Sequence, residues 1–219
     1  MTPSRLIPLF MSMAFLSACG GGGADAGTPG PAPTPPAPSN TCSTAGVAAS
    51  NASTFNTVCM LTTQGEIVVE LYAAQSPITV ANFLKYVTAG RYDNTLYHRV
   101  VAGFVIQGGG YTTTGAGVAT YAPITLESNN GLSNIRGTIA MARTSDPNSA
   151  TSQFFINTVD NSACLDRGKT VCDATGNGYA VFGKVIYGLD TVDKIAAVSV
   201  DGNSQPRTNV VTYWAKQLK

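Results

Sequence analysis

Arg99 and Gln107 are two polar side chains in an otherwise apolar stretch, which reads YHRVVAGFVIQGGG over residues 97–110. If the chain turns at Ala102-Gly103, the alternation of side chains along a strand returns Gln107 to a position beside Arg99. A guanidinium and an amide on a mostly apolar surface can donate hydrogen bonds to the backbone of a bound peptide. The pattern therefore favours a surface that binds an extended peptide.

A second pair of segments extends this predicted surface. Residues 137–143 read GTIAMAR and residues 152–157 read SQFFIN. Alternation along the second segment places Gln153 and Phe155 on one face. Together with Arg99 and Gln107, these side chains predict an apolar pocket with hydrogen-bond donors at its rim.

The composition excludes several other functions. The 219 residues carry 13 Lys and Arg against 12 Asp and Glu, and a net charge of +1 gives no field that would attract nucleic acid. One histidine and the absence of a C-x-x-C motif argue against a metal centre, so we expect no metal and no cofactor. That histidine, His98, should face away from Arg99 and be structural. Gly108–Gly110 predict a turn, because no Lys-Ser/Thr follows to complete a phosphate loop.

Hydrophobic patterns predict the elements that must position these residues. Residues 58–63 and 66–72 predict a β-hairpin. Ser76-Pro77 supplies an N-cap and a first-turn proline for a helix that ends at Gly90, and residues 189–196 predict a second, short helix. Further strands are expected at 96–101, 104–107, 138–142, 154–157, 181–186 and 209–214. Many short strands with two helices favour a barrel or a sandwich.

The N-terminal region has the pattern of an exported protein. A short basic start and an apolar stretch end in LSAC at Cys19, a tetrad that resembles the lipobox of bacterial lipoproteins. Ordinary secretory cleavage near Ala18 is the alternative. We expect a signal peptide at 1–18, a lipidated Cys19 with a Gly/Pro-rich linker at 19–40, and a folded domain at 41–219. Gly20 after the cysteine favours the outer membrane, facing the periplasm.

The other four cysteines indicate an oxidising compartment. Cys42, Cys59, Cys164 and Cys172 are an even number in a chain that leaves the cytoplasm, which predicts two disulfides. Three pairings are possible. We favour the short-range one, Cys42 with Cys59 and Cys164 with Cys172, because each bridge would hold a segment beside a strand or a Gly-rich loop.

Four segments resemble one known family. The stretches YHRVVAGFVIQGGG, GTIAMAR, SQFFIN and YAVFGKV (residues 179–185) are similar to cyclophilin-type peptidyl-prolyl cis-trans isomerases, especially the bacterial periplasmic kind. The resemblance covers about residues 57–218 and implies a closed eight-stranded antiparallel β-barrel capped by two helices. It implies an isomerase that rotates Xaa-Pro bonds and assists the folding of exported proteins. Its partners would be proline-containing unfolded or extended polypeptides, and we expect a monomer that meets the membrane only through its lipid.

The resemblance also assigns roles to residues of the predicted pocket. Arg99 corresponds to the catalytic arginine, with Gln107 as its hydrogen-bonded neighbour. The proline pocket would be lined by Phe104, Val105, Phe155 and Leu165. The peptide chain would be held by Ala142, the backbone of Arg143, and Gln153, with Tyr179 at the rim.

Cys164 departs from the family pattern, because the residue before Leu165 is commonly Trp or Phe there. The only Trp is Trp214, near the C-terminus, so the resemblance implies weak binding of cyclosporin. Two other functions remain open on the sequence. One is a chaperone-like module that binds proline-containing peptides and has incidental isomerase activity. The other is a ligand-holding barrel of the lipocalin type, which no motif in the sequence supports.

Overall fold

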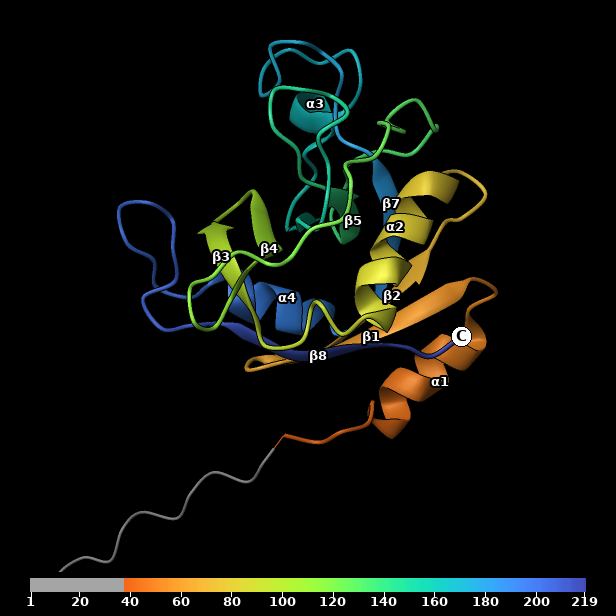
Figure 1. Cartoon of the computed structure of the whole chain (residues 1–219), viewed down its shortest axis with the longest axis vertical. Coiled ribbons are helices and arrows are strands. Elements are labelled where there is room, and N and C mark those ends of the chain that lie inside the picture. The colour runs from red at the N-terminus through yellow and green to blue at the C-terminus, as the bar shows by residue number, and fades with distance from the viewer. Residues whose placement is uncertain (1–37) are drawn as a thin grey trace, which may run out of the picture. The chain divides into compact units, whose positions relative to one another are not determined.

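The computed structural model describes residues 38–219, which form a closed barrel of eight antiparallel strands in the order β1-β2-β7-β5-β6-β4-β3-β8 (Figure 1). The strands are β1 (Asn56–Thr62), β2 (Gly65–Leu71), β3 (Thr95–Val101), β4 (Val105–Thr112), β5 (Thr138–Met141), β6 (Phe154–Asn157), β7 (Val181–Tyr187) and β8 (Val211–Gln217). The predicted fold class is confirmed. The predicted signal peptide, Cys19 and most of the predicted linker lie outside the described residues.

The β1–β2 hairpin forms where the sequence predicts it, with Thr62 opposite Gly65 at the turn. Gly65 has a φ of +131°, and a side chain there would meet Thr191. Ile67 and Val69 of β2 are fully buried in the barrel interior, while Glu66 and Glu70 on alternate positions are not. The period-2 pattern therefore fixes which face of the hairpin points inward.

Aromatic rings fill the interior beneath α2 (Pro77–Thr88). Phe83 of this helix packs against Tyr92, Phe154 and Phe182, with ring centroids 5.2, 5.7 and 5.1 Å away. Helix α4 (Leu189–Ala196) contributes the buried Val192 and Ile195 to the same core. The two predicted helices thus close the barrel with the apolar faces that their spacing indicates.

The start of α2 differs from the prediction. Ser76 is the N-cap residue, but its hydroxyl donates to the carbonyl of Val181 (2.8 Å) instead of accepting from the helix. The carboxylate of Glu127 accepts from the backbone N–H groups of Ile78 and Thr79 at 3.1 and 2.8 Å. A side chain distant in sequence therefore satisfies the free donors of the first turn.

Two further helices were not predicted, α1 (Thr44–Ala52) and α3 (Ser162–Leu165). The buried residues of α1 are Gly46 and Ser50, so it carries no apolar stripe that the sequence could reveal. Two disulfides join Cys42 to Cys59 and Cys164 to Cys172, which is the short-range pairing. The first joins the segment just before α1 to β1, and the second joins α3 to the loop that follows it. Within residues 38–219, no helix is long and apolar enough to cross a membrane.

The prediction of a turn at Gly108–Gly110 is wrong, because these glycines lie within β4. A Cβ on Gly108 would meet the ring of Tyr97 at 3.3 Å, and one on Gly109 would meet the carbonyl of Ser152 at 2.7 Å. The glycines therefore provide close approach between strands and not reversal of the chain.

Candidate active site

Ten residues line a hollow of about 350 Å³ on the outer face of β3, β4 and β6, which we call the Arg99 hollow. Its lining consists of Arg99, Phe104, Val105, Gln107, Ala142, Arg143, Phe155, Leu165, Cys172 and Tyr179. Neighbours of these residues on the same strands, such as Ile106 and Ile156, point into the barrel core. Strand alternation therefore separates the hollow from the core.

Arg99 and Gln107 face each other across the β3–β4 pair, as the alternation predicts. Nη1 of Arg99 lies 3.4 Å from Oε1 of Gln107, and Nε2 of Gln107 donates to Oε1 of Gln153 at 2.9 Å. A contact of 3.4 Å is long for a hydrogen bond. Among the described residues no carboxylate pairs with Arg99, so its guanidinium keeps N–H donors available for a ligand.

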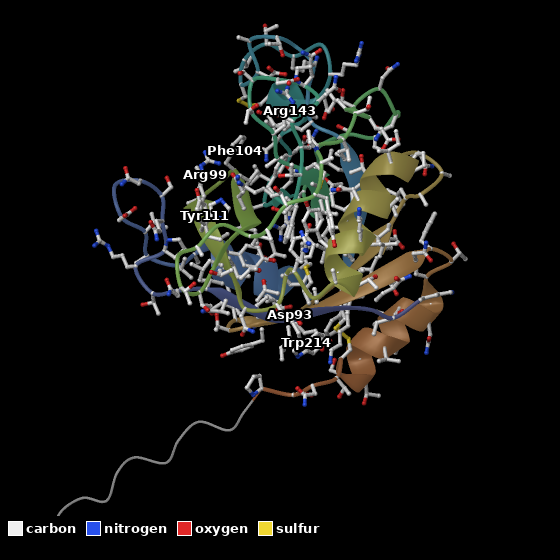
Figure 2. The ribbon with its side chains drawn as sticks, viewed as in Figure 1. Asp93, Arg99, Phe104, Tyr111, Arg143 and Trp214 are labelled. Atoms are coloured by element: carbon white, nitrogen blue, oxygen red, sulfur yellow. A yellow bond between two sulfur atoms is a disulfide. The ribbon has the colours of Figure 1, made fainter. Side chains whose placement is uncertain are left out.

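The wall beside this guanidinium is apolar. Phe155 stands next to Gln107 in the β4–β6 pairing and packs in a cluster with Val105, Leu165 and Val181. Phe155 is only 4% exposed, so the ring is both packed against the barrel and in contact with the hollow. Figure 2 shows Arg99, Phe104 and Arg143 at the end of the domain away from Trp214. An apolar ring of a ligand could be buried against this wall, within reach of the Arg99 guanidinium.

The structure brings nine of the ten predicted binding and catalytic residues together in the hollow. Gln153 is the exception: it lines a neighbouring recess and reaches the hollow through its hydrogen bond to Gln107. Cys172 lines the hollow as well, which agrees with the interpretation of residues 166–178 as a disulfide-braced loop beside the pocket.

The prediction that His98 faces away from Arg99 is wrong, because both residues line one recess on the other side of the guanidinium. The β3–β4 register shifts between Tyr97 and Arg99, so β3 has one extra residue at His98 and alternation fails there. Burial lowers the pKa of the His98 imidazole; the Leu96 carbonyl and Gln153 oppose this effect, and the charge of Arg99 adds to it. The lowered pKa favours the neutral form of the imidazole.

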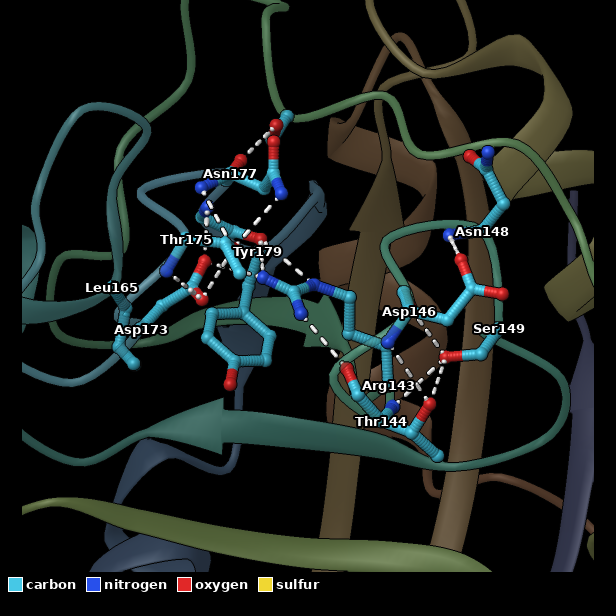
Figure 3. A network of polar contacts seen from close by, with 12 residues as sticks. Arg143, Thr144, Asp146, Asn148, Ser149, Leu165, Asp173, Thr175, Asn177 and Tyr179 are labelled. Atoms are coloured by element: carbon cyan, nitrogen blue, oxygen red, sulfur yellow. Dashed lines mark hydrogen bonds and ion pairs between the residues drawn. The ribbon is translucent and has the colours of Figure 1, made fainter.

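Arg143 makes the contact that the sequence does not foresee, a buried ion pair with Asp173 (Figure 3). Their side chains are 2% and 6% exposed, and Nη2 lies 2.5 Å from Oδ2. Asp173 also accepts from the Thr175 hydroxyl (2.6 Å) and the Gly178 N–H (2.8 Å). The spacing Asp-x-Thr is typical of a side-chain-closed turn, but nothing in the sequence indicates its partner 30 residues upstream.

We expect this carboxylate to stabilise the fold at neutral pH and to lose that contribution in acid. Burial by itself raises the pKa of Asp173, but hydrogen bonds from Thr175 and Gly178 and the charge of Arg143 together outweigh it and lower that pKa from 3.8 to about 2. A lowered pKa stabilises the folded state above pH 3.8, and the contribution is lost as pH falls towards 2. Thermal unfolding should show the difference in melting temperature between wild type and Asp173→Asn shrinking over this window. An unchanged difference down to pH 2 would contradict it.

Comparison with known proteins places this geometry in context. Residues 57–216 match the family model described as cyclophilin type peptidyl-prolyl cis-trans isomerase/CLD. A peptidyl-prolyl cis-trans isomerase of Acinetobacter baylyi is 55% identical over 139 residues, covering 64% of this chain and 71% of that protein. Peptidyl-prolyl cis-trans isomerase A of Dickeya dadantii is 46% identical over 167 residues, covering 76% and 84%.

The fold is also similar to solved structures. The crystal structure of a Cryptosporidium parvum cyclophilin type peptidyl-prolyl cis-trans isomerase superposes with a TM-score of 0.61 at 26% identity, over 75% of this chain and 98% of that one. The same protein in the presence of the dipeptide Ala-Pro gives a TM-score of 0.60 at 26% identity, over 74% and 99%.

Proposed function

This chain belongs to the cyclophilin-type peptidyl-prolyl cis-trans isomerases, and from that premise we propose that Arg99 is its catalytic residue and the Arg99 hollow its proline-binding pocket. The activity is the rotation of Xaa-Pro peptide bonds. The observation that supports the assignment is a guanidinium held by one long contact, to Gln107, at the edge of an apolar wall.

The barrier to this rotation is about 18–20 kcal/mol, because the nitrogen lone pair is delocalised into the carbonyl. Twisting the bond localises the lone pair on nitrogen. A donor fixed at that place hydrogen-bonds the nitrogen in the twisted state and not in either planar state, so it lowers the barrier. The free N–H groups of Arg99 are suited to this role, and the reaction needs no nucleophile or general acid.

Magnitudes show that Arg99 cannot act alone. Uncatalysed isomerisation takes tens of seconds or longer. Reaching milliseconds requires about four decades, or about 5.5 kcal/mol, whereas one preorganised donor supplies about 2.7–4 kcal/mol. The remainder is assigned to the apolar wall around Phe155 and to polar groups at the rim that hold the flanking peptide. Those groups are the amides of Gln107 and Gln153 and the backbone at Ala142 and Arg143, where the Ala142 N–H is already bonded to the Gln153 carbonyl (2.9 Å) and the Ala142 carbonyl is left to accept.

The proposed ligands are proline-containing, extended polypeptides bound by a monomer. The Cryptosporidium parvum relative was crystallised in the presence of Ala-Pro, which supports a proline ring as the group that enters the Arg99 hollow. The test is the refolding of a protein whose slow phase is an Xaa-Pro isomerisation, with and without this enzyme. Acceleration of the slow phase is expected. Binding of the unfolded chain without acceleration would instead favour a chaperone-like module.

The proposed location is the bacterial cell envelope, with the enzyme anchored through Cys19 to the outer membrane and facing the periplasm. The LSAC tetrad followed by Gly20 supports this, and so do the two disulfides, which belong in an oxidising compartment. Labelled palmitate should be incorporated into the wild-type chain and not into Cys19→Ser. Equal labelling of both chains, or of neither, would overturn the anchor.

We expect weak binding of cyclosporin. The family position that contributes an aromatic contact is Cys164 here, and its sulfur is tied to Cys172 in the wall of the Arg99 hollow. Trp214 cannot replace the missing ring, because it lies on β8 and donates from Nε1 to the carbonyl of Ser39. Calorimetric titration should therefore give a Kd well above the nanomolar range, and a low nanomolar Kd would refute the prediction.

A further inference from the structure

The loop between α3 and β7, residues 166–180, forms one wall of the Arg99 hollow. Cys172 of this loop lines the hollow and is bonded to Cys164 in α3. Cys164 in turn packs against the cluster that contains Phe155 and Leu165. The loop is thus fixed at its middle to the same apolar cluster that the substrate ring would touch.

Asp173, the next residue, closes the loop on itself. Its Oδ1 accepts from the N–H and the hydroxyl of Thr175 at 3.1 and 2.6 Å, and its Oδ2 accepts from the N–H of Gly178 at 2.8 Å. Gly178 has a φ of +70°, and a Cβ there would lie 2.5 Å from the backbone nitrogen of Arg167. Only a glycine fits this corner, so the carboxylate and the glycine together set the course of the loop up to Tyr179.

The same carboxylate holds the side chain of Arg143 buried at the wall of the hollow, where it is only 2% exposed. All three nitrogens of this guanidinium donate: Nε to Gly178 O (3.1 Å), Nη1 to Thr144 O (2.8 Å), and Nη2 to Asp173 (2.5 Å) and Gly178 O (3.0 Å). Figure 3 shows Asp173 on the loop side of the Arg143 guanidinium and Thr144 on the opposite side. Arg143 therefore makes four hydrogen bonds and its charge is paired, in contrast to Arg99.

The ion pair also supports the wall of the hollow. The Arg143 guanidinium carbon lies 4.6 Å from the centre of the Tyr179 ring, and this ring meets Phe155 edge to face with centroids 5.6 Å apart. A continuous series of contacts therefore runs from Asp173 through Arg143 and Tyr179 to Phe155. If the carboxylate lost its charge, a buried guanidinium would be left unpaired, and its desolvation would drive it towards water and the adjoining hollow.

We propose that Asp173 is a positioning and specificity-determining residue of the substrate site: it keeps the charge of Arg143 paired and buried at the wall of the Arg99 hollow and Tyr179 against Phe155. Of the two arginines that line the hollow, Arg99 is then the one whose charge a substrate peptide meets unpaired. The proposal rests on the proposed function of the hollow. Asp173 is expected to affect how substrate binds, whereas Arg99 is expected to affect how fast the Xaa-Pro bond of the bound substrate rotates.

The test compares Ala-Pro peptides that carry Glu or Lys beside the proline, in wild type and in Asp173→Asn. The variant exposes an uncompensated positive charge at the rim, so the ratio of kcat/KM for the Glu peptide to that for the Lys peptide should rise about tenfold at low salt and less at high salt. KM for a neutral peptide should rise while kcat stays within twofold. A loss of kcat with unchanged KM would indicate instead that the proposed site is disturbed as a whole.

The double variant Arg143→Met/Asp173→Asn removes both charges and should return the ratio to its wild-type value. The matched control is Asp193→Asn, which breaks an exposed ion pair with Arg136 (2.9 Å, side chains 42% and 51% exposed) and should change neither KM nor the ratio. A wild-type ratio in Asp173→Asn, or a double variant that keeps the shift, would overturn the proposal. If Asp173→Asn does not fold, Arg143→Met is the second test. It leaves the Asp173 carboxylate unpaired, so the Glu-to-Lys ratio of kcat/KM should fall below the wild-type value.

Discussion

Replacing Arg99 with alanine is expected to lower kcat/KM for an Ala-Pro peptide by about 10²–10³-fold, the usual cost of removing one preorganised donor to a developing charge. The reason is geometric: among the described residues, Arg99 offers the guanidinium without an acidic partner at the edge of the apolar wall. The melting temperature should hardly change, because the lost interaction within the protein is a single contact of 3.4 Å to Gln107. A protease-coupled assay measures the rate.

Arg99→Lys is the matched control for charge. Lysine keeps the positive charge but presents it as a compact ammonium without the planar fork of donors. We expect its activity to lie between those of wild type and Arg99→Ala. Activity of Arg99→Ala within threefold of wild type would remove Arg99 from the mechanism, and full activity of Arg99→Lys would show that charge alone is sufficient.

Replacing Phe155 with alanine is expected to damage both stability and substrate binding. Phe155 is 4% exposed and packs against Val105, Leu165 and Val181, so truncation should lower the free energy of unfolding by about 3–5 kcal/mol. The proline ring would also lose about 1–2 kcal/mol of apolar contact, which corresponds to a KM about tenfold higher. Denaturant unfolding and steady-state kinetics at 10 °C measure the two effects.

Phe155→Leu separates these effects, because leucine restores most of the buried volume but not the flat ring that faces Tyr179 at 5.6 Å. We expect most of the stability to return while KM stays raised. If Phe155→Leu had the KM of wild type, the aromatic wall would have no special role in binding. If Phe155→Ala kept the wild-type KM, the ring would not contact substrate.

Local patterns were sufficient to predict much of the site. The alternation that places Gln107 opposite Arg99 depends only on the period of a strand and on a short turn, and both are visible in the sequence. The same holds for Phe155, whose position in β6 places it next to Gln107. The roles of Phe104, Leu165 and Tyr179 could be predicted only from the family resemblance. Without that resemblance, a single aromatic residue or leucine is interpreted as part of the hydrophobic core.

Residues that depend on distant contacts could not be predicted. Glu127 satisfies the first turn of α2 from 48 residues away, and Asp173 meets Arg143 across 30 residues. Neither pairing leaves a local pattern. His98 was misplaced because one extra residue in β3, between Tyr97 and Arg99, puts His98 on the same side of the strand as Arg99, and a bulge has no composition signal here. Helix α1 escaped prediction because it buries Gly46 and Ser50 and not an apolar face.

Exchange of a bound peptide is the measurement closest to the central claim, that the Arg99 guanidinium stabilises the twisted prolyl bond. Two-dimensional NMR exchange spectra of an Ala-Pro peptide, recorded at matched occupancy of wild type and Arg99→Ala, separate binding from rotation. We predict clear exchange between cis and trans on wild type and exchange at least a hundredfold slower on the variant, with similar affinity for the peptide. Equal exchange rates on the two proteins would contradict the mechanism.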